Sequence, residues 1–310
     1  MKKFSSDWYW YYVINYALVI IILFPIYWTF ISSVKVPDEL ITNKPTFYPH
    51  NWTWEYYDTT WNFNDEMRTK LQKEVSGSTT ITAGIERAFM NSGIVTLGTI
   101  ILSLIVCTLA GYSLTFFRIP FKEAIFILLI LPILIPAISL IIPIYKLLKS
   151  LGLTDTHIGL IFLHSTAMLP IGVFMMRNAF SSIPSSLREV ALLEGTSELR
   201  IMATIMIPLA IPGLLTVMVF ALYISWNDYI LAFIYINSPD NIMLNTTLAK
   251  IALGGAKFEM KWGNLTAGSI ISFIPIIIIY SILQRYFIRG ITGSAVKESV
   301  SYTHLRAHET

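Results

Sequence analysis

The sequence offers few side chains that could do covalent chemistry. No GxxxxGK[ST], HExxH, CxxC or GxSxG sequence occurs, so neither a nucleotide-phosphate loop nor a metal site is predicted. The only cysteine, Cys107, lies in an apolar run, where packing between helices is favoured over a role as a reactive thiol. The histidines are scattered along the chain: His50, His157, His164, His304 and His308.

The spacing with the clearest meaning occurs in SSIPSSLREVALLEGTSELRIMATIMIP, residues 181–208. Pro184 suits a first helical turn, and Ser186 precedes Glu189 by the three residues of a capping box. Gly195 can end a helix in the left-handed conformation. These signals predict a short amphipathic helix that either lies on the lipid surface or inserts into a soluble partner. Its mostly apolar face comprises Leu187, Val190, Ala191, Leu193 and Glu194, beside Arg188 and Glu189.

The composition indicates that lipid covers much of the chain. Hydrophobic residues make up 55% and charged residues 13%, whereas soluble domains average about 45–50% and about 25%. The net charge of +3 is too small to suggest nucleic acid. Six continuous apolar runs reach about the 20 residues that a spanning helix needs, which predicts an all-α polytopic membrane protein. They are residues 10–33, 91–117, 122–146, 157–179, 204–226 and 266–287.

Six crossings place both termini on one side of the membrane. The density of Lys and Arg favours a cytoplasmic N-terminus, residues 1–9, about twofold. The loop 34–90 is then extracytoplasmic, and residues 181–208 are cytoplasmic. The polar tail, 298–310, is unlike the rest of the chain, and we expect it to be non-native or disordered.

Two features inside the predicted helices have open interpretations. His164 is the one ionisable residue well inside a run, either as part of a proton relay or as a histidine bonded within the bundle. Ion-driven carriers usually need more buried carboxylates than these runs offer. Several prolines are either hinges or static kinks: Pro25, Pro132, Pro136, Pro143, Pro170, Pro212 and Pro275.

At residues 181–208 the chain resembles the permease subunits of bacterial ATP-binding-cassette importers. Their cytoplasmic loop has an EAA motif, a glycine and, nine residues later, I-x-L-P. Glu189, Ala191 and Gly195 match it, and Ile205, Met206, Ile207 and Pro208 follow at the right distance. Val190 replaces the first family alanine, and Glu194 replaces a frequent aspartate.

The resemblance covers about residues 10–297 and is closest to the six-helix subunit of the maltose-type carbohydrate permeases. It rests on the order and spacing of several short segments. These are Ser32–Lys35, Phe89–Ser92, Gly152–Thr156, Ser225–Tyr229 and Arg289–Lys297.

The resemblance implies a type I importer permease fold and a function in ATP-driven sugar import across a bacterial cell membrane. The expected partners are a second permease, an ATPase dimer and an extracytoplasmic sugar-binding protein. ATP and magnesium would bind the ATPase, with no cofactor or catalytic residue on this chain. Tyr223 and Trp226 either stack on a sugar ring or anchor the chain at the interface. The expected ATPase-coupling residues are Arg188, Glu189, Ala191, Glu194 and Gly195.

Overall fold

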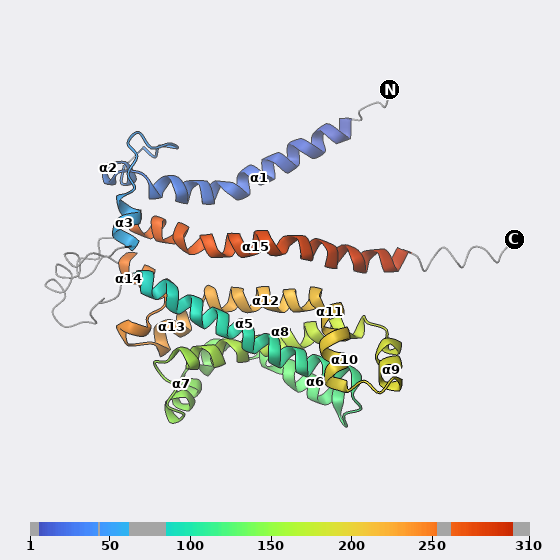
Figure 1. Ribbon diagram of the computed structural model, residues 1–310. Helices are drawn as coiled ribbons and strands as arrows, with labels where there is room; N and C mark the ends of the chain where they lie inside the picture. Colours follow the sequence, from blue (N-terminus) through green and yellow to red (C-terminus); the bar gives the residue numbers. More distant parts are fainter. Residues whose placement is uncertain (1–5, 43, 62–84, 253–261, 300–310) are drawn as a thin grey trace. The chain divides into compact units, whose positions relative to one another are not determined.

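The computed structural model describes residues 6–42, 44–61, 85–252 and 262–299, which are mostly helical (Figure 1). Within these ranges no β-strand occurs beyond one isolated bridge between Lys35 and Trp52. The predicted all-α class is therefore confirmed. The predicted tail from residue 298 lies outside the described ranges except for its first two residues, which end the last helix. Residues 62–84 of the predicted outer loop also lie outside them.

Among the described residues, four helices are long and apolar enough to cross a membrane as single helices. Each overlaps a run that the sequence predicts to span, with ends shifted by several residues. Proline does not break three of them: Pro25, Pro170 and Pro275 lie inside continuous helix. The four are α1 (Ser6–Ser33), α5 (Ile85–Phe116), α8 (His157–Ser181) and α15 (Trp262–Ser299).

The predicted helix 122–146 is not continuous. The segment Lys122–Leu134 meets the segment Ala137–Ser150 at 96°. Ile135, which precedes Pro136, has extended backbone at φ −89° and ψ 121°, because the proline ring disfavours helix in the residue before it. The helical pieces are α6 (Lys122–Ile130), η1 (Leu131–Leu134), η2 (Ala137–Leu140) and α7 (Ile141–Ser150).

The predicted helix 204–226 also contains a sharp bend, of 79° at Ala210. Pro208 and Pro212 flank this residue, and neither can donate a backbone hydrogen bond. The Ala210 N–H donates to Met206 O at 2.9 Å and to Ile207 O at 3.0 Å. The pieces are α10 (Glu198–Ile201), the π-helical η3 (Met202–Met206), α11 (Ile207–Leu209) and α12 (Ile211–Trp226).

The chain forms two compact units. Unit 1 comprises residues 1–89 and 244–275, and it contains α1, α2 (Pro37–Leu40), α3 (Glu55–Trp61), α14 (Leu244–Ala252) and the first part of α15. Within it, Asn264 Nδ2 donates to Thr59 Oγ1 at 2.9 Å and to Thr60 Oγ1 at 3.1 Å. A Cβ at Gly263 would collide with the ring of Tyr56, so glycine lets α3 approach α15 closely.

Unit 2 comprises residues 90–243 and 276–310, and its core lies among α5, α8 and α12. Cys107 is fully buried in this core, as its apolar run predicts. Figure 1 shows α9 (Ser185–Leu193) and α13 (Ile230–Tyr235) at opposite ends of the unit. At the α13 end, the Asp155 N–H donates to Tyr235 O at 3.0 Å. At the α9 end, Arg177 pairs with Glu123 at 2.5 Å.

Each bent segment joins the two ends of unit 2. The first begins near Glu123 at the α9 end. It reaches the α13 end, where Ile141 O accepts a hydrogen bond from the hydroxyl of Tyr235. The second leaves Glu198 at the α9 end and reaches Trp226, beside α13. If each bent segment is one span, the described residues contain six crossings, the number that the sequence predicts.

Candidate coupling site

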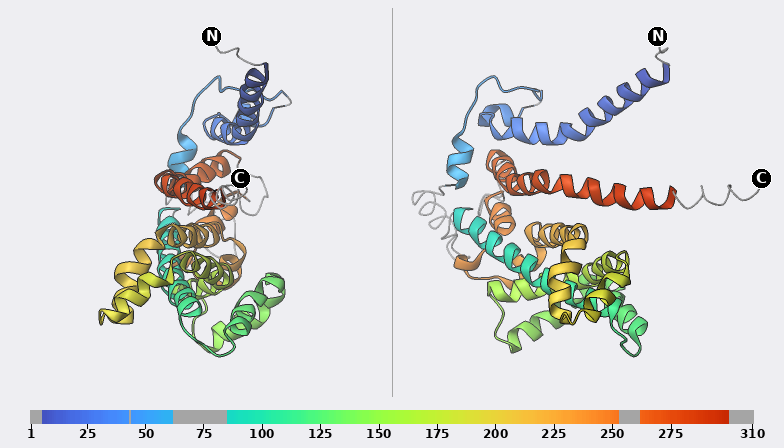
Figure 2. Two further views of the ribbon diagram at one scale, coloured as in Figure 1. Left: turned by 90° about the vertical axis from the view of Figure 1, so that its right-hand side faces the viewer. Right: turned by 45° about the vertical axis from the view of Figure 1, so that its right-hand side comes forward.

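The helix α9 presents most of its apolar residues to the surface. Ala191 is 6% exposed and joins the core of unit 2. By contrast, Leu187, Val190 and Leu193 are exposed, and Leu193 reaches 88%. Figure 2 shows α9 and α10 projecting from one side of the unit. Exposed apolar side chains on a projecting helix fit both interpretations of the sequence, contact with the lipid surface and insertion into a partner.

The start of α9 differs from the predicted capping box. Pro184 is the N-cap residue, at φ −58° and ψ 126°, and it makes no side-chain cap. The helix begins at Ser185, so Ser186 already lies within the first turn. A capping box needs its serine at the N-cap, where the side chain can accept from the free N–H groups. The capping-box prediction was therefore wrong, because it placed the N-cap two residues after Pro184.

The end of α9 forms the glycine turn that the sequence predicts. Gly195 has φ +78°. The Gly195 N–H donates to Leu192 O at 3.0 Å, and the Thr196 N–H donates to Ala191 O at 3.1 Å. These two bonds are those of a Schellman motif, which satisfies the last carbonyls of a helix. The turn fixes the direction in which the chain leaves α9 for α10.

Arg188 has a partner within the chain that the sequence analysis missed. Its Nε donates to Glu198 Oε1 at 2.7 Å, and its Nη2 donates to Glu198 Oε2 at 3.0 Å. The hydroxyl of Tyr112, on α5, donates to the same Oε1 at 2.5 Å. One carboxylate thus joins α9, α10 and α5. Glu198 lies ten residues after Arg188, across a turn, where no periodic spacing would pair them.

The ion pair is partly shielded from water. The Arg188 side chain is 19% exposed and that of Glu198 is 27% exposed. The Arg188 guanidinium lies 5.8 Å from the ring centres of Phe116 and Phe117. The hydrogen bonds that Arg188 donates to Glu198 raise the pKa of Arg188 above its usual value. Glu189 and Glu194, by contrast, are exposed on α9.

The second half of the motif lies in the irregular segment after α10. Residues 205 and 206 belong to the π-helical turn η3, and 207 and 208 belong to α11. Met206 and Ile201 are fully buried in the core of unit 2. The motif therefore combines the projecting helix α9 with the buried residues Ile201 and Met206. Glu198 lies between these two parts in the sequence.

A second polar cluster lies deep in unit 2. His164 Nε2 is 3.2 Å from Asp228 Oδ2, and the His164 side chain is 1% exposed. The Asp228 carboxylate also accepts the N–H groups of Leu231 at 3.1 Å and Ala232 at 2.9 Å. It thereby caps α13 and contacts α8 at once. His164 therefore contacts a carboxylate inside the bundle, although neither of its ring nitrogens makes a hydrogen bond with the described residues.

The two aromatic candidates for sugar stacking have different surroundings. Trp226 is 5% exposed, so its ring packs within unit 2. Tyr223 is 66% exposed on α12. Of the two, only Tyr223 presents its ring to the surroundings of the chain.

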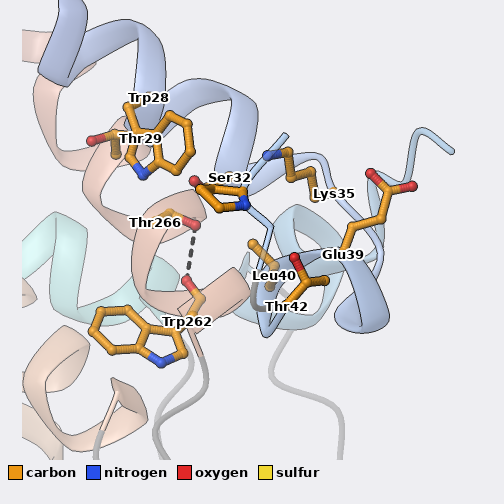
Figure 3. A pocket seen from close by; sticks show the side chains of 10 residues that line it. Trp28, Thr29, Ser32, Lys35, Glu39, Leu40, Thr42, Trp262 and Thr266 are labelled. Atoms are coloured by element: carbon orange, nitrogen blue, oxygen red, sulfur yellow. Dashed lines mark hydrogen bonds between the residues drawn. The ribbon is translucent and has the colours of Figure 1, made fainter. Parts of the chain in front are cut away.

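Unit 1 contains a pocket of about 310 Å³ between α1, the segment after it and α15. Figure 3 shows the indole rings of Trp28 and Trp262 with Lys35 and Glu39 around it. Both charged side chains form hydrogen bonds with backbone groups of the segment after α1. Lys35 Nζ donates to Thr46 O. Glu39 accepts the N–H groups of His50 at 3.1 Å and Asn51 at 3.0 Å. These charges order the segment after α1.

The family whose model matches the chain is described as binding-protein-dependent transport system inner membrane component, and the match covers residues 105–293. The chain belongs to this family. The matched region includes α8, α9, the Gly195 turn and both bent segments. The permease is therefore a membrane protein, and the predicted family is confirmed.

Relatives match the permease over most of its length. The probable ABC transporter permease YurM of Bacillus subtilis is 31% identical over 288 residues, covering 92% of this chain and 87% of that protein. The inner membrane ABC transporter permease YcjP of Escherichia coli is 29% identical over 284 residues, covering 90% and 92%. The trehalose transport system permease SugB of Mycobacterium tuberculosis is 30% identical over 210 residues, covering 68% and 76%.

One solved structure has the same fold. It is the crystal structure of a bacterial ABC transporter involved in the import of the acidic polysaccharide alginate. It matches with a TM-score of 0.74 at 22% identity, covering 93% of this chain and 100% of the matched chain. The importer permease fold expected from the sequence is thereby confirmed.

Proposed function

We propose that this chain is a permease subunit of an ATP-driven sugar importer and that α9 is the element gripped by its ATPase. The observation that carries the proposal is the exposed apolar surface of α9, formed by Leu187, Val190 and Leu193 on a helix whose end is fixed by Gly195. Relatives named as sugar permeases, SugB among them, support the substrate class.

The chain would form half of a translocation path, with a second permease supplying the other half. An ATPase dimer would bind on the cytoplasmic side, where α9 lies if the N-terminus is inside. An extracytoplasmic protein would deliver the sugar at the other face. ATP and magnesium would bind the ATPase, since this sequence holds no P-loop.

Coupling follows from differential binding. If the ATPase dimer binds the outward-facing state more tightly when it holds ATP, closure of the dimer shifts the permease toward that state. The coupling is reciprocal, so delivery of sugar to the outward-facing state would in turn favour closure of the ATPase dimer. Glu189 and Glu194 are exposed on α9 and are available for polar contacts with the ATPase.

The test uses the complete transporter, purified with its ATPase and reconstituted in liposomes. Leu193→Glu should reduce ATPase co-purification and sugar uptake, because it places a charge on the docking surface. The matched control is Leu151→Glu, an exposed leucine at the α13 end of unit 2, 61% exposed. Equal ATPase binding by wild type and Leu193→Glu would contradict the docking role of α9.

A further inference from the structure

The helix α9 has little apolar hold on the rest of the chain. Its one buried side chain is Ala191, which contributes a single methyl group to the core. Its larger apolar side chains face outward. A docking helix that transmits force needs a firm connection to the bundle, and burial of Ala191 alone supplies a weak one.

The Arg188–Glu198 pair supplies a directional connection. Both carboxylate oxygens of Glu198 accept from the guanidinium, at 2.7 Å and 3.0 Å. Two parallel hydrogen bonds fix orientation as well as distance, which a single contact would not do. Because both side chains are mostly buried, water and salt screen the pair less than a surface pair.

The connection continues into the membrane-spanning part. Tyr112 is 2% exposed and lies near the C-terminal end of α5, packed against Phe116 and Phe180. Its hydroxyl donates to Glu198 Oε1. Glu198 is also the first residue of α10, and α10 leads through η3 to α12. A displacement of α9 therefore acts on two spanning helices through one carboxylate.

We propose that the Arg188–Glu198–Tyr112 cluster is the connection through which movement of α9 reaches α5 and α12. Arg188 and Glu198 are then positioning residues within the permease, and Arg188 is not a contact to the ATPase. This inference rests on the proposed coupling function of α9.

The experiment exchanges the two charges in the reconstituted transporter. Arg188→Glu and Glu198→Arg singly should each lower sugar uptake per ATP hydrolysed by about tenfold, while the ATPase still co-purifies. The double variant R188E/E198R should restore most of the uptake. Tyr112 can accept a hydrogen bond from arginine as well as donate one, so it tolerates the exchange.

The ratio of sugar uptake to ATP hydrolysed separates positioning from a merely structural role. A destabilised permease loses sugar uptake and ATP hydrolysis together, so this ratio does not fall. The matched control is Arg200→Glu, an exposed arginine on α10 outside the cluster, which should leave the ratio unchanged. If the double variant stays as defective as the single ones, Arg188 acts on another molecule and the proposal is overturned.

If the reversed charges prevent insertion of the permease into the membrane, a double-mutant cycle of uncharged variants tests the same pair. Arg188→Gln, Glu198→Gln and the double variant are compared at equal membrane abundance. The double variant should lose no more coupling than either single one, because both remove the same pair. Additive losses would overturn the proposal. Failure of the proposed function itself would look different, since the wild-type chain would not bind an ATPase at all.

Discussion

The backbone N–H of Thr196 donates to the carbonyl of Ala191 at 3.1 Å, and this bond closes the chain around Gly195. A Cβ at Gly195 would meet nothing within 4 Å, so space does not require glycine there. The backbone conformation does, because φ is +78°. The turn therefore depends on the freedom of glycine in the left-handed region.

Gly195→Arg should cost the turn about 1–2 kcal/mol through left-handed backbone strain alone. We expect loss of sugar uptake with normal membrane insertion. Gly195→Asn should retain more uptake, since asparagine tolerates the left-handed region better. Uptake and membrane abundance measured together check the order Gly, Asn, Arg. Wild-type uptake by an abundant Gly195→Arg protein would show that the turn is not needed.

We expect substitution of Asp228 to lower thermal stability, because its carboxylate contacts both His164 and the start of α13. Asp228→Ala removes the cap of α13, worth about 1 kcal/mol, and also the partner of His164. Asp228→Asn keeps an oxygen that accepts backbone N–H groups, so its loss should be smaller. Thermal unfolding of the purified transporter in detergent measures both variants. Equal stability of Asp228→Ala and wild type would contradict the structural role.

The helix α5 packs closely on α8 at Gly111, so we expect a larger side chain there to destabilise the permease. A Cβ there would lie 2.6 Å from Met176 Cβ and 2.9 Å from the Arg177 backbone N. Gly111→Ala should therefore force the helices apart, at about 1–3 kcal/mol. Gly93→Ala, on the same helix, is the control because a Cβ there meets nothing within 4 Å. Thermal unfolding in detergent should separate the two variants, and equal midpoints would show that α5 does not pack as described.

The segment after α1 should loosen at low pH. The N–H groups of His50 and Asn51 donate to Glu39 and hold its pKa below the usual 4.5. The stabilisation is complete above pH 4.5 and is lost as pH falls through the lower folded value. Hydrogen exchange across residues 45–53 should rise at acid pH in wild type relative to Glu39→Gln at the same pH. Parallel behaviour of the two proteins would contradict this assignment.

Hydropathy alone predicted the positions of four continuous apolar helices and of two bent segments, since a run of about 20 apolar residues has few alternatives. It did not predict which segments bend. Pro170 and Pro275 lie inside continuous helices, whereas Pro136 and Pro212 adjoin sharp turns. A proline removes one N–H in each case, and the surrounding packing decides whether the preceding residue leaves the helix.

The coupling site was predictable where its rules are local. The Gly195 turn that ends α9 follows from spacing within about a dozen residues. The cluster around Glu198 does not, because Arg188 lies ten residues before it across a turn and Tyr112 lies 86 residues away. The exposure of Leu193 is likewise a tertiary property, since an apolar helical residue usually faces the core.

The helix α12 is constrained unequally at its ends. Past Trp226, Asp228 ties the chain to α8 and to the start of α13. Before Ile211, the chain turns by 79°. We expect a push on the preceding segment to displace the Gly213 end of α12 first, against α8, where a Cβ at Gly213 would lie 2.5 Å from Ala179 Cβ. A passage lined by such a helix would change its width mainly at one mouth.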